Sequence, residues 1–166
     1  MISQRCFLQE LCNKYGDFKV ARAWRDSEGT PHWTTHRSVL DCWHSDDGLR
    51  FLDTVNNRTI LPCEIVLDLD TTPSLLLFHQ LCDFLEKEYG FAYLAYTSGS
   101  RGFHVHIIDG ALLDCTTRLR QEMRKILIQK TGCDLLKQSE KVMIALENAP
   151  HWKTGQPKTL LRRYPL

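Results

Sequence analysis

Two short apolar stretches of the chain carry ionisable residues at alternating positions. Asp68 and Asp70 close the first stretch, and His104 and His106 alternate with apolar residues in the second. Two carboxylates spaced two residues apart repel each other unless a cation neutralises them, and hard divalent cations such as Mg²⁺ and Mn²⁺ prefer oxygen ligands. Asp68 and Asp70 are therefore candidate metal ligands. The simpler alternative is a strand that ends in solvent.

A glycine-rich segment, Ser98-Gly-Ser-Arg-Gly-Phe-His104, leads into the second stretch. Its small residues allow a tight turn whose backbone N–H groups suit phosphate oxygens. Arg101 adds a forked donor for phosphate, and His104 adds a ring that can hydrogen-bond it. The alternative is a plain hairpin turn with a solvated arginine.

The segment His151-Trp-Lys-Thr-Gly155 is predicted to form a turn that presents His151 and Lys153. A basic stretch follows it, in which Lys158, Arg162 and Arg163 are candidate contacts to nucleic acid. A surface hairpin without such a role is the alternative.

Length and composition predict one domain. The 166 residues are 43% hydrophobic and 25% charged, as in ordinary globular chains. The chain contains no long apolar run and no recognisable signal peptide, so we expect a cytoplasmic or nucleoid-associated protein without a membrane partner. Seven cysteines without a Cys-x-x-Cys pair predict reduced thiols. Zinc is not expected. The four candidate ligands are His32, His36, Cys42 and His44, and their spacing matches no zinc module.

The charge is unevenly distributed around a net value of +1. Residues 118–166 hold 11 Lys and Arg against 4 Asp and Glu, whereas the rest of the chain holds 10 against 16. This asymmetry favours a polyanionic partner at the basic end. The alternative is a solvated helix face that carries Arg118, Arg120, Arg124 and Lys125.

The predicted elements form an N-terminal αβ unit over residues 1–62 and a second unit over residues 63–166. For the first unit, capping residues and apolar spacing predict a helix from Ser3 to Tyr15, a hairpin of strands Phe18–Trp24 and His32–Arg37, and a short helix Asp46–Val55. For the second, the pattern predicts strands Cys63–Asp70, Phe91–Thr97, Phe103–Ile108 and Lys141–Leu146, with helices Thr72–Tyr89 and Thr116–Thr131. Thr72 and Pro73 are the expected cap and first residue of the earlier helix.

The order of the second unit is β-α-β-β-α-β, which predicts an α+β fold with a ferredoxin-like (RRM-like) unit. In that arrangement the first and third strands are adjacent at the centre of the sheet, and both helices cover one face. Because side chains alternate along a strand, Asp68 and Asp70 should share the opposite, open face with His104 and His106.

The combination of these motifs closely resembles the catalytic core of the archaeo-eukaryotic primases, meaning the small primase subunit and its primase-polymerase relatives. Those enzymes carry an apolar strand ending in Asp-x-Asp, a Ser-Gly-x-Arg-Gly-x-His turn and a late His-x-Lys-Thr-Gly segment. The resemblance covers about residues 18–160, and the second motif is its most specific part.

The resemblance implies a template-dependent nucleotidyltransferase that makes or extends primers by two-metal phosphoryl transfer. Single-stranded DNA and nucleoside triphosphates would be its partners, and Mg²⁺ or Mn²⁺ its cofactor. It implies catalytic and metal-binding roles for Asp68 and Asp70, a catalytic role for His104, and nucleotide contacts from Ser98, Arg101, His104, His151 and Lys153. The family usually supplies a third acidic ligand, and counting back from His151 reaches Ser139. Its neighbour Glu140 is the candidate, with Asp134 and Glu147 as alternatives.

Two other functions fit parts of the sequence. The segment Asp68-Leu-Asp-Thr-Thr72 also resembles the nucleophile motif of haloacid-dehalogenase-type phosphatases, but no adjacent acidic pair follows it. A catalytically weak or inactive primase-fold accessory subunit would bind nucleic acid or a larger primase or replication subunit instead. The displaced third ligand favours this alternative, as does the lack of the zinc-binding insertion and helical subdomain of larger relatives.

Overall fold

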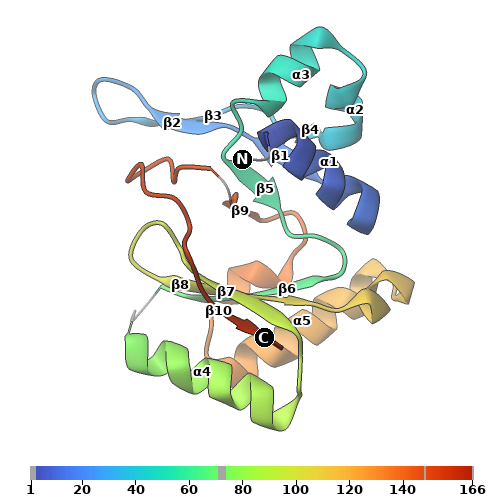
Figure 1. Ribbon diagram of the computed structural model, residues 1–166, viewed down its shortest axis with the longest axis vertical. Helices are drawn as coiled ribbons and strands as arrows, with labels where there is room; N and C mark the ends of the chain where they lie inside the picture. The colour runs from blue at the N-terminus through green and yellow to red at the C-terminus, as the bar shows by residue number, and fades with distance from the viewer. Residues whose placement is uncertain (1–2, 71–73, 148, 166) are drawn as a thin grey trace.

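The computed structural model describes residues 3–70, 74–147 and 149–165, which form an α+β fold with two four-stranded antiparallel sheets (Figure 1). The helices are α1 (Gln4–Tyr15), α2 (Val39–Trp43), α3 (Asp46–Leu52), α4 (Leu75–Glu88) and α5 (Thr117–Thr131), with 3₁₀ turns η1 (Gly110–Asp114) and η2 (Leu135–Gln138). The strands are β1 (Lys19–Ala21), β2 (Ala23–Arg25), β3 (Pro31–Trp33), β4 (Arg37–Ser38), β5 (Asn57–Thr59), β6 (Glu64–Leu69), β7 (Tyr93–Thr97), β8 (Phe103–Ile108), β9 (Met143–Ala145) and β10 (Leu160–Tyr164). No described helix has the length and apolar character that a membrane crossing requires.

The N-terminal unit is built from helices α1 to α3 and a sheet of order β4-β1-β5-β9. Ser3 caps α1 by accepting a hydrogen bond from the Cys6 N–H, and Gly16 ends the helix, as the sequence predicts. The predicted hairpin is present but its first strand is broken at Arg22, so β1 joins the sheet while β2 pairs with β3 alone. The β2–β3 ribbon therefore projects from the body of the protein (Figure 1).

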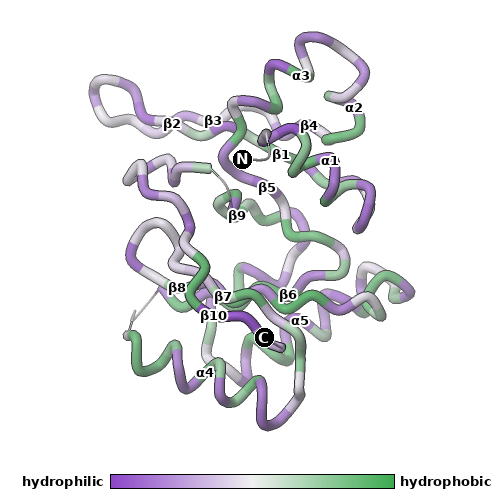
Figure 2. The backbone as a smooth tube through the Cα atoms, viewed as in Figure 1, coloured by the Kyte–Doolittle hydropathy of each residue, from purple (hydrophilic) through white to green (hydrophobic). Residues whose placement is uncertain are grey.

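The second sheet has the order β10-β7-β8-β6, and α4 and α5 cover one of its faces (Figure 1). Ile65 and Leu67 of β6 and Val105 and Ile107 of β8 pack into the core beneath these helices, which confirms the predicted alternation. Figure 2 shows that hydrophobic residues are concentrated in β6, β7 and β8, whereas the β2–β3 ribbon is largely hydrophilic. The predicted helix Thr116–Thr131 is confirmed as α5, with Thr116 as its cap and Gly132 in the left-handed conformation.

The last predicted strand is the main difference in topology. Residues 143–145 form β9, which pairs with β5 of the first sheet rather than with β6, so β6 lies at a sheet edge and not at the centre. The segment before η2 approaches this edge, where the Asp134 N–H donates to the Asp68 carbonyl at 3.1 Å. The chain then returns to add β10 beside β7. The β6-β8-β7 order matches the expected adjacency of the first and third strands, but the fourth strand of a ferredoxin-like unit is not beside β6.

The face of the second sheet opposite α4 and α5 is covered, which corrects the prediction of an open face. Val66 packs there against Ile60 and Ile144 of the first sheet's strands and loops. His104 and His106 are 7% and 2% exposed, and Asp68 is 3% exposed. These three side chains are therefore buried and are not presented on an open face.

The start of α4 also differs from the prediction. Ser74 is its cap and accepts a hydrogen bond from the Leu77 N–H. The predicted cap Thr72 and first residue Pro73 lie outside the described residues. All seven cysteines are free thiols, and five of them are buried.

Arg124 is fully buried, so it does not belong to the solvated helix face that was the alternative explanation of this basic segment. Its guanidinium donates to the carbonyl oxygens of Leu61, Pro62 and Glu64 at 2.8–3.0 Å, and to Glu140 at 2.8 Å. It thus ties α5 to the turn that enters β6.

Replacing this side chain with an apolar one of similar length should destabilise the fold. We expect Arg124→Met to lower the free energy of unfolding by about 3–5 kcal/mol, because it leaves buried carbonyl groups and Glu140 without their donor. Urea-induced unfolding measures this loss. Arg118→Met, on the exposed side of the same helix, should change stability by less than about 0.5 kcal/mol. Equal losses in the two variants would contradict the role given to Arg124.

Candidate functional site

Three segments that are distant in sequence meet at the end of β6. Gly102 packs so closely against β6 that a Cβ on it would lie 2.7 Å from the Leu69 carbonyl oxygen and 2.8 Å from the Asp70 Cβ. Gly99, at φ +75°, packs against the opposite segment, where a Cβ would lie 2.8 Å from the Gln156 carbonyl oxygen and 3.0 Å from the His151 Cβ. The Ser98–Gly102 turn is therefore held between the Asp68–Asp70 segment and the loop of residues 151–158.

Ser98 shapes this turn. Its hydroxyl oxygen accepts hydrogen bonds from the N–H groups of Ser100 and Gly102 at 3.2 and 3.0 Å, and the residue is buried. Two of the N–H groups expected to receive phosphate are thus already used, which corrects that part of the prediction. Across the described chain no intramolecular acceptor is found for the N–H groups of Gly99 and Arg101, and the Arg101 side chain is exposed.

Asp68 is buried among donors. Its Oδ2 lies 3.3 Å from His104 Nε2 and 3.2 Å from Lys137 Nζ. Burial disfavours the carboxylate, but contact with His104 and Lys137 outweighs it and lowers the pKa of Asp68 to about 2. The second oxygen of Asp68, Oδ1, is buried and has no partner among the described residues, and the same is true of His104 Nδ1.

Asp70 and Asp134 extend this acidic cluster toward solvent. The Asp68 carboxylate is the main cause that raises the pKa of Asp70, with Asp134 adding to it and Lys137 and Arg101 opposing it. The Asp134 carboxylate lies 3.9 Å from Lys137 Nζ. Three carboxylates and two cationic side chains thus act on one another at this point.

The protein also contains a second acidic group, Glu64, His106 and Glu147, whose potential ligand atoms all lie within 4.8 Å of one another. This group could hold a metal ion. In the described chain it is the one set of three that meets this geometric condition, so Asp68, Asp70 and Asp134 do not form an equally compact set.

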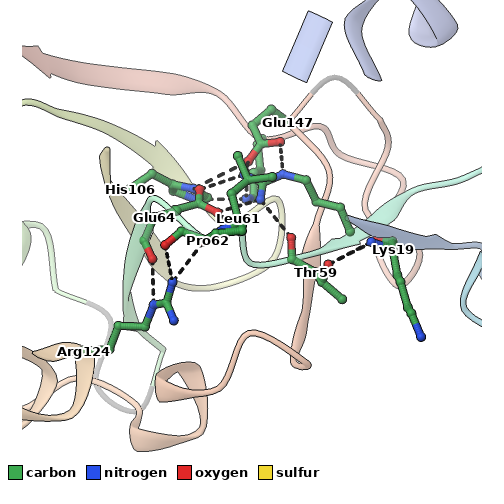
Figure 3. A network of polar contacts seen from close by, with 10 residues as sticks. Lys19, Thr59, Leu61, Pro62, Glu64, His106, Arg124 and Glu147 are labelled. Atoms are coloured by element: carbon green, nitrogen blue, oxygen red, sulfur yellow. Dashed lines mark hydrogen bonds and ion pairs between the residues drawn. The ribbon is translucent and has the colours of Figure 1, made fainter. Parts of the chain in front are cut away.

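Glu64, His106 and Glu147 belong to a buried network that joins the two sheets (Figure 3). Arg58 of β5 makes two hydrogen bonds to Glu64 of β6, at 2.7 and 2.8 Å, and two to Glu147, at 2.7 and 3.0 Å. Lys158 Nζ lies 3.5 Å from Glu147, and burial lowers the pKa of Lys158 to about 8. Two cations therefore already neutralise the two carboxylates.

The hydrogen bonds of His106 fix its protonation. Its Nε2 lies 3.2 Å from the Lys158 ammonium, which can only donate, so Nε2 must accept. Its Nδ1 then carries the proton and donates to Glu64 at 2.6 Å. Burial lowers the pKa of His106, which agrees with a neutral ring. This network has the character of a structural ion-pair core.

Three predicted site residues have other roles. Glu140 is bound by Arg120 and Arg124 at the entry to β6, about 13 Å of strand away from Asp68, so it does not lie beside the candidate metal ligands. Lys158 is buried in the network and is not a surface contact for nucleic acid. Arg162 pairs with Asp83 and Glu86 of α4 at 3.0 and 2.7 Å.

The remaining predicted residues lie near the turn or at the surface. His151 is half-buried beside Gly99 and accepts a hydrogen bond from the Lys153 N–H at 3.3 Å. Lys153 and Arg163 are exposed, and their predicted contacts with nucleotide and nucleic acid stay predictions.

Sequence reasoning weighed Asp134 and Glu147 without choosing them, and it missed Lys137 and two members of the buried network, Arg58 and Glu64. Alternation offered a signal for Glu64, because it has the same parity as Asp68 in an otherwise apolar strand. No comparable signal exists for Lys137 or Arg58, whose partners are brought close only by the folded chain. A comparison with protein-family models finds no match, and neither does a comparison with curated proteins.

We expect stability to fall as the pH is lowered from about 6.5 to 4. Burial lowers the pKa of His104 to about 4 and also lowers that of His106, so the unfolded chain takes up protons that the folded protein does not. Below about pH 4.5 the loss should steepen, because the pKa of Glu147 is about 2 and the folded carboxylate stays ionised.

Denaturant unfolding at a series of pH values measures this dependence. His106→Gln should reduce the slope between pH 6.5 and 4, whereas His79→Gln, on the exposed side of α4, should leave it unchanged. A stability that is constant from pH 7 to 4 would contradict the buried neutral histidines.

Proposed function

We propose that this protein is a metal-dependent nucleotidyltransferase of the primase-polymerase type, acting on nucleoside triphosphates and a single-stranded template. The observation that carries the proposal is the meeting of the Asp68–Asp70 segment, the Ser98–Gly102 turn and the 151–158 loop at the end of β6. These are the three motifs of the resemblance, and nothing in their sequence separation requires them to be neighbours.

Asp68, Asp70 and Asp134 are the residues that would hold Mg²⁺ or Mn²⁺. Two features support the fit: the buried Oδ1 of Asp68 has no partner among the described residues and so leaves one ligand oxygen free, and the pKa of Asp70 is raised by the neighbouring carboxylate of Asp68. Lys137 provides the compensating cation at Asp68 in this conformation. A bound ion would activate the attacking hydroxyl and stabilise the leaving pyrophosphate.

The other residues of the candidate site would orient the Asp68 carboxylate and neutralise the charge of a bound triphosphate. His104, neutral at pH 7, lies against Asp68 Oδ2 and keeps this carboxylate in place. The exposed Arg101 guanidinium, together with the N–H groups of Gly99 and Arg101, offers donors that suit the oxygens of a triphosphate. Ser98 acts indirectly, by holding the turn in shape.

A second candidate function is that of a non-catalytic primase-fold subunit. The observation that favours it is the deep burial of Asp68 and its ion pair with Lys137, because a resident ammonium competes with a divalent ion for the same oxygen. In that case the cluster would be structural, and the protein would bind nucleic acid or a replication partner without chemistry.

Primer extension separates these two functions. The protein is incubated with a single-stranded template, nucleoside triphosphates and Mn²⁺, with and without a primer. We expect Asp68→Asn to lower the rate by about a hundredfold or more, because it removes a charge that would hold the ions. Asp41→Asn, on the exposed surface of α2, is the matched control and should keep full activity.

Product formed equally by the Asp68→Asn variant would show that the chemistry lies elsewhere. No product from the unchanged protein, together with no Mn²⁺-dependent nucleotide binding, would favour the non-catalytic subunit. Thermal unfolding of each variant verifies that it is folded.

Arg101 provides an independent test of the phosphate contact. Arg101→Ala should weaken binding of a nucleoside triphosphate by about tenfold while leaving binding of the nucleoside nearly unchanged, because charge-assisted hydrogen bonds to phosphate are lost. Isothermal titration with both ligands measures the difference. Equal weakening of the two would mean that Arg101 does not contact phosphate.

A further inference from the structure

A cleft of about 640 Å³ lies between the β2–β3 ribbon and the loop that starts at Ala149. Trp24 lines one side of the cleft and Trp152 the other. Trp24 is 37% exposed, and Trp33, which packs against Trp152, is 44% exposed. Indole rings are large and mostly apolar, and exposed rings gathered at one cleft are typical of a binding site.

Cationic side chains accompany these rings. The Arg22 guanidinium lies 5.6 Å from the centre of the Trp24 ring, and the Arg25 guanidinium lies 5.6 Å from the Trp152 ring. Lys153 Nζ lies 5.1 Å from the same Trp152 ring. Each ring thus has positive charge next to it, and all three cations line the cleft.

Among the described residues, the one acidic side chain that lines the cleft, Asp53, already forms an ion pair with Arg5. Asp26, at the tip of the ribbon, is hydrogen-bonded to His32 at 2.8 Å. The positive charge of Arg22, Arg25 and Lys153 is therefore left to an external anion.

Neighbouring aromatic side chains support the rings of Trp24 and Trp152. Trp33 meets Trp152 edge to face at 5.6 Å, and His32 stacks on Trp24 at 5.4 Å. Asn56 fixes the edge of β2 by hydrogen bonds to the Ala23 N–H and carbonyl groups, both at 2.8 Å. Rings supported in this way lose little freedom when a planar ligand stacks on them.

We propose that this cleft is a binding site for single-stranded nucleic acid, in which bases stack on Trp24 and Trp152 while Arg22, Arg25 and Lys153 neutralise the adjacent phosphates. Aromatic rings interleaved with cations are the means by which proteins hold single strands without reading their sequence. The site is separate from the carboxylate cluster and requires no metal. It deepens the proposed function and rests on it for the role of the bound strand, which would be the template.

The cleft lies on the same side of the molecule as the candidate functional site. The loop of residues 151–158 forms a wall of the cleft on one side and packs against Gly99 on the other. In Figure 1 the β2–β3 ribbon, this loop and the turn between β7 and β8 all lie on the left of the molecule. The 151–158 loop and the Ser98–Gly102 turn thus lie between a strand in the cleft and Asp70.

The test uses fluorescence anisotropy of a labelled thymidine oligonucleotide about ten residues long, with EDTA and without nucleotides, so that catalysis plays no part. A backbone of the same length without bases is the matched ligand. We expect the base-free backbone to bind at least about tenfold more weakly, because stacking is lost while the phosphates remain.

Two variants and two controls complete the test. Trp24→Ala and Trp152→Ala should each weaken binding of the thymidine oligonucleotide by roughly tenfold. Tyr89→Ala is the matched control, since Tyr89 is an equally exposed ring, at 37%, with Lys130 over its face on the opposite unit. The Asp68→Asn variant should bind as tightly as the unchanged protein, even if the proposed catalysis fails.

Three results would overturn the proposal: equal binding of the two ligands, an equal loss in the Tyr89→Ala variant, or no binding of the oligonucleotide at all. Trp24 is 37% exposed and belongs to none of the hydrophobic core clusters of the described residues, so Trp24→Ala is the variant least exposed to a folding defect. Loss of the difference between the two ligands in this variant would complete the case for stacking.

Discussion

The contact between Arg58 and the two carboxylates Glu64 and Glu147 is the interaction on which the rest of the structure depends. It lies where the two sheets face each other, and each group would be prohibitively costly to bury alone. Buried ion pairs add little stability compared with apolar packing, but they accept few alternative geometries. The network therefore specifies how the N-terminal unit meets the second sheet, and through Lys158 it also fixes the loop that carries His151.

Much of the fold could be predicted from local patterns. The caps at Ser3 and Thr116, the alternation along β6 and β8 and the β2–β3 turn all follow from residues near one another in sequence. The position of β9 could not be predicted, because a short apolar strand pairs equally well with any free edge. β9 pairs with β5 of the first sheet, and no local pattern records that choice between edges.

The candidate site shows the same contrast between what the local sequence predicts and what only the folded chain reveals. Asp68, Asp70 and Arg101 were chosen from their spacing and residue type, and the structure places the segments that carry them side by side, whereas their chemical roles stay predictions. Glu140 and Lys158 were misplaced because charge alone does not reveal whether a side chain is already paired. Glu140 is bound by two arginines of α5, and Lys158 shares a buried position with Glu147 and His106. Sequence indicates which residues can do chemistry, whereas the competing partners of each charge become known only from the fold.

The buried network also bears on the order in which the protein can assemble. Arg58 and Glu64 are synthesised long before Glu147, which is 89 positions beyond Arg58, and before Lys158. Until those late residues arrive, the early groups can pair with each other, but the layer between the sheets has an incomplete set of charges and stays accessible to water. Contacts at such separations form slowly. The interface between the two sheets is therefore expected to close late in synthesis, when Glu147 and Lys158 complete the network.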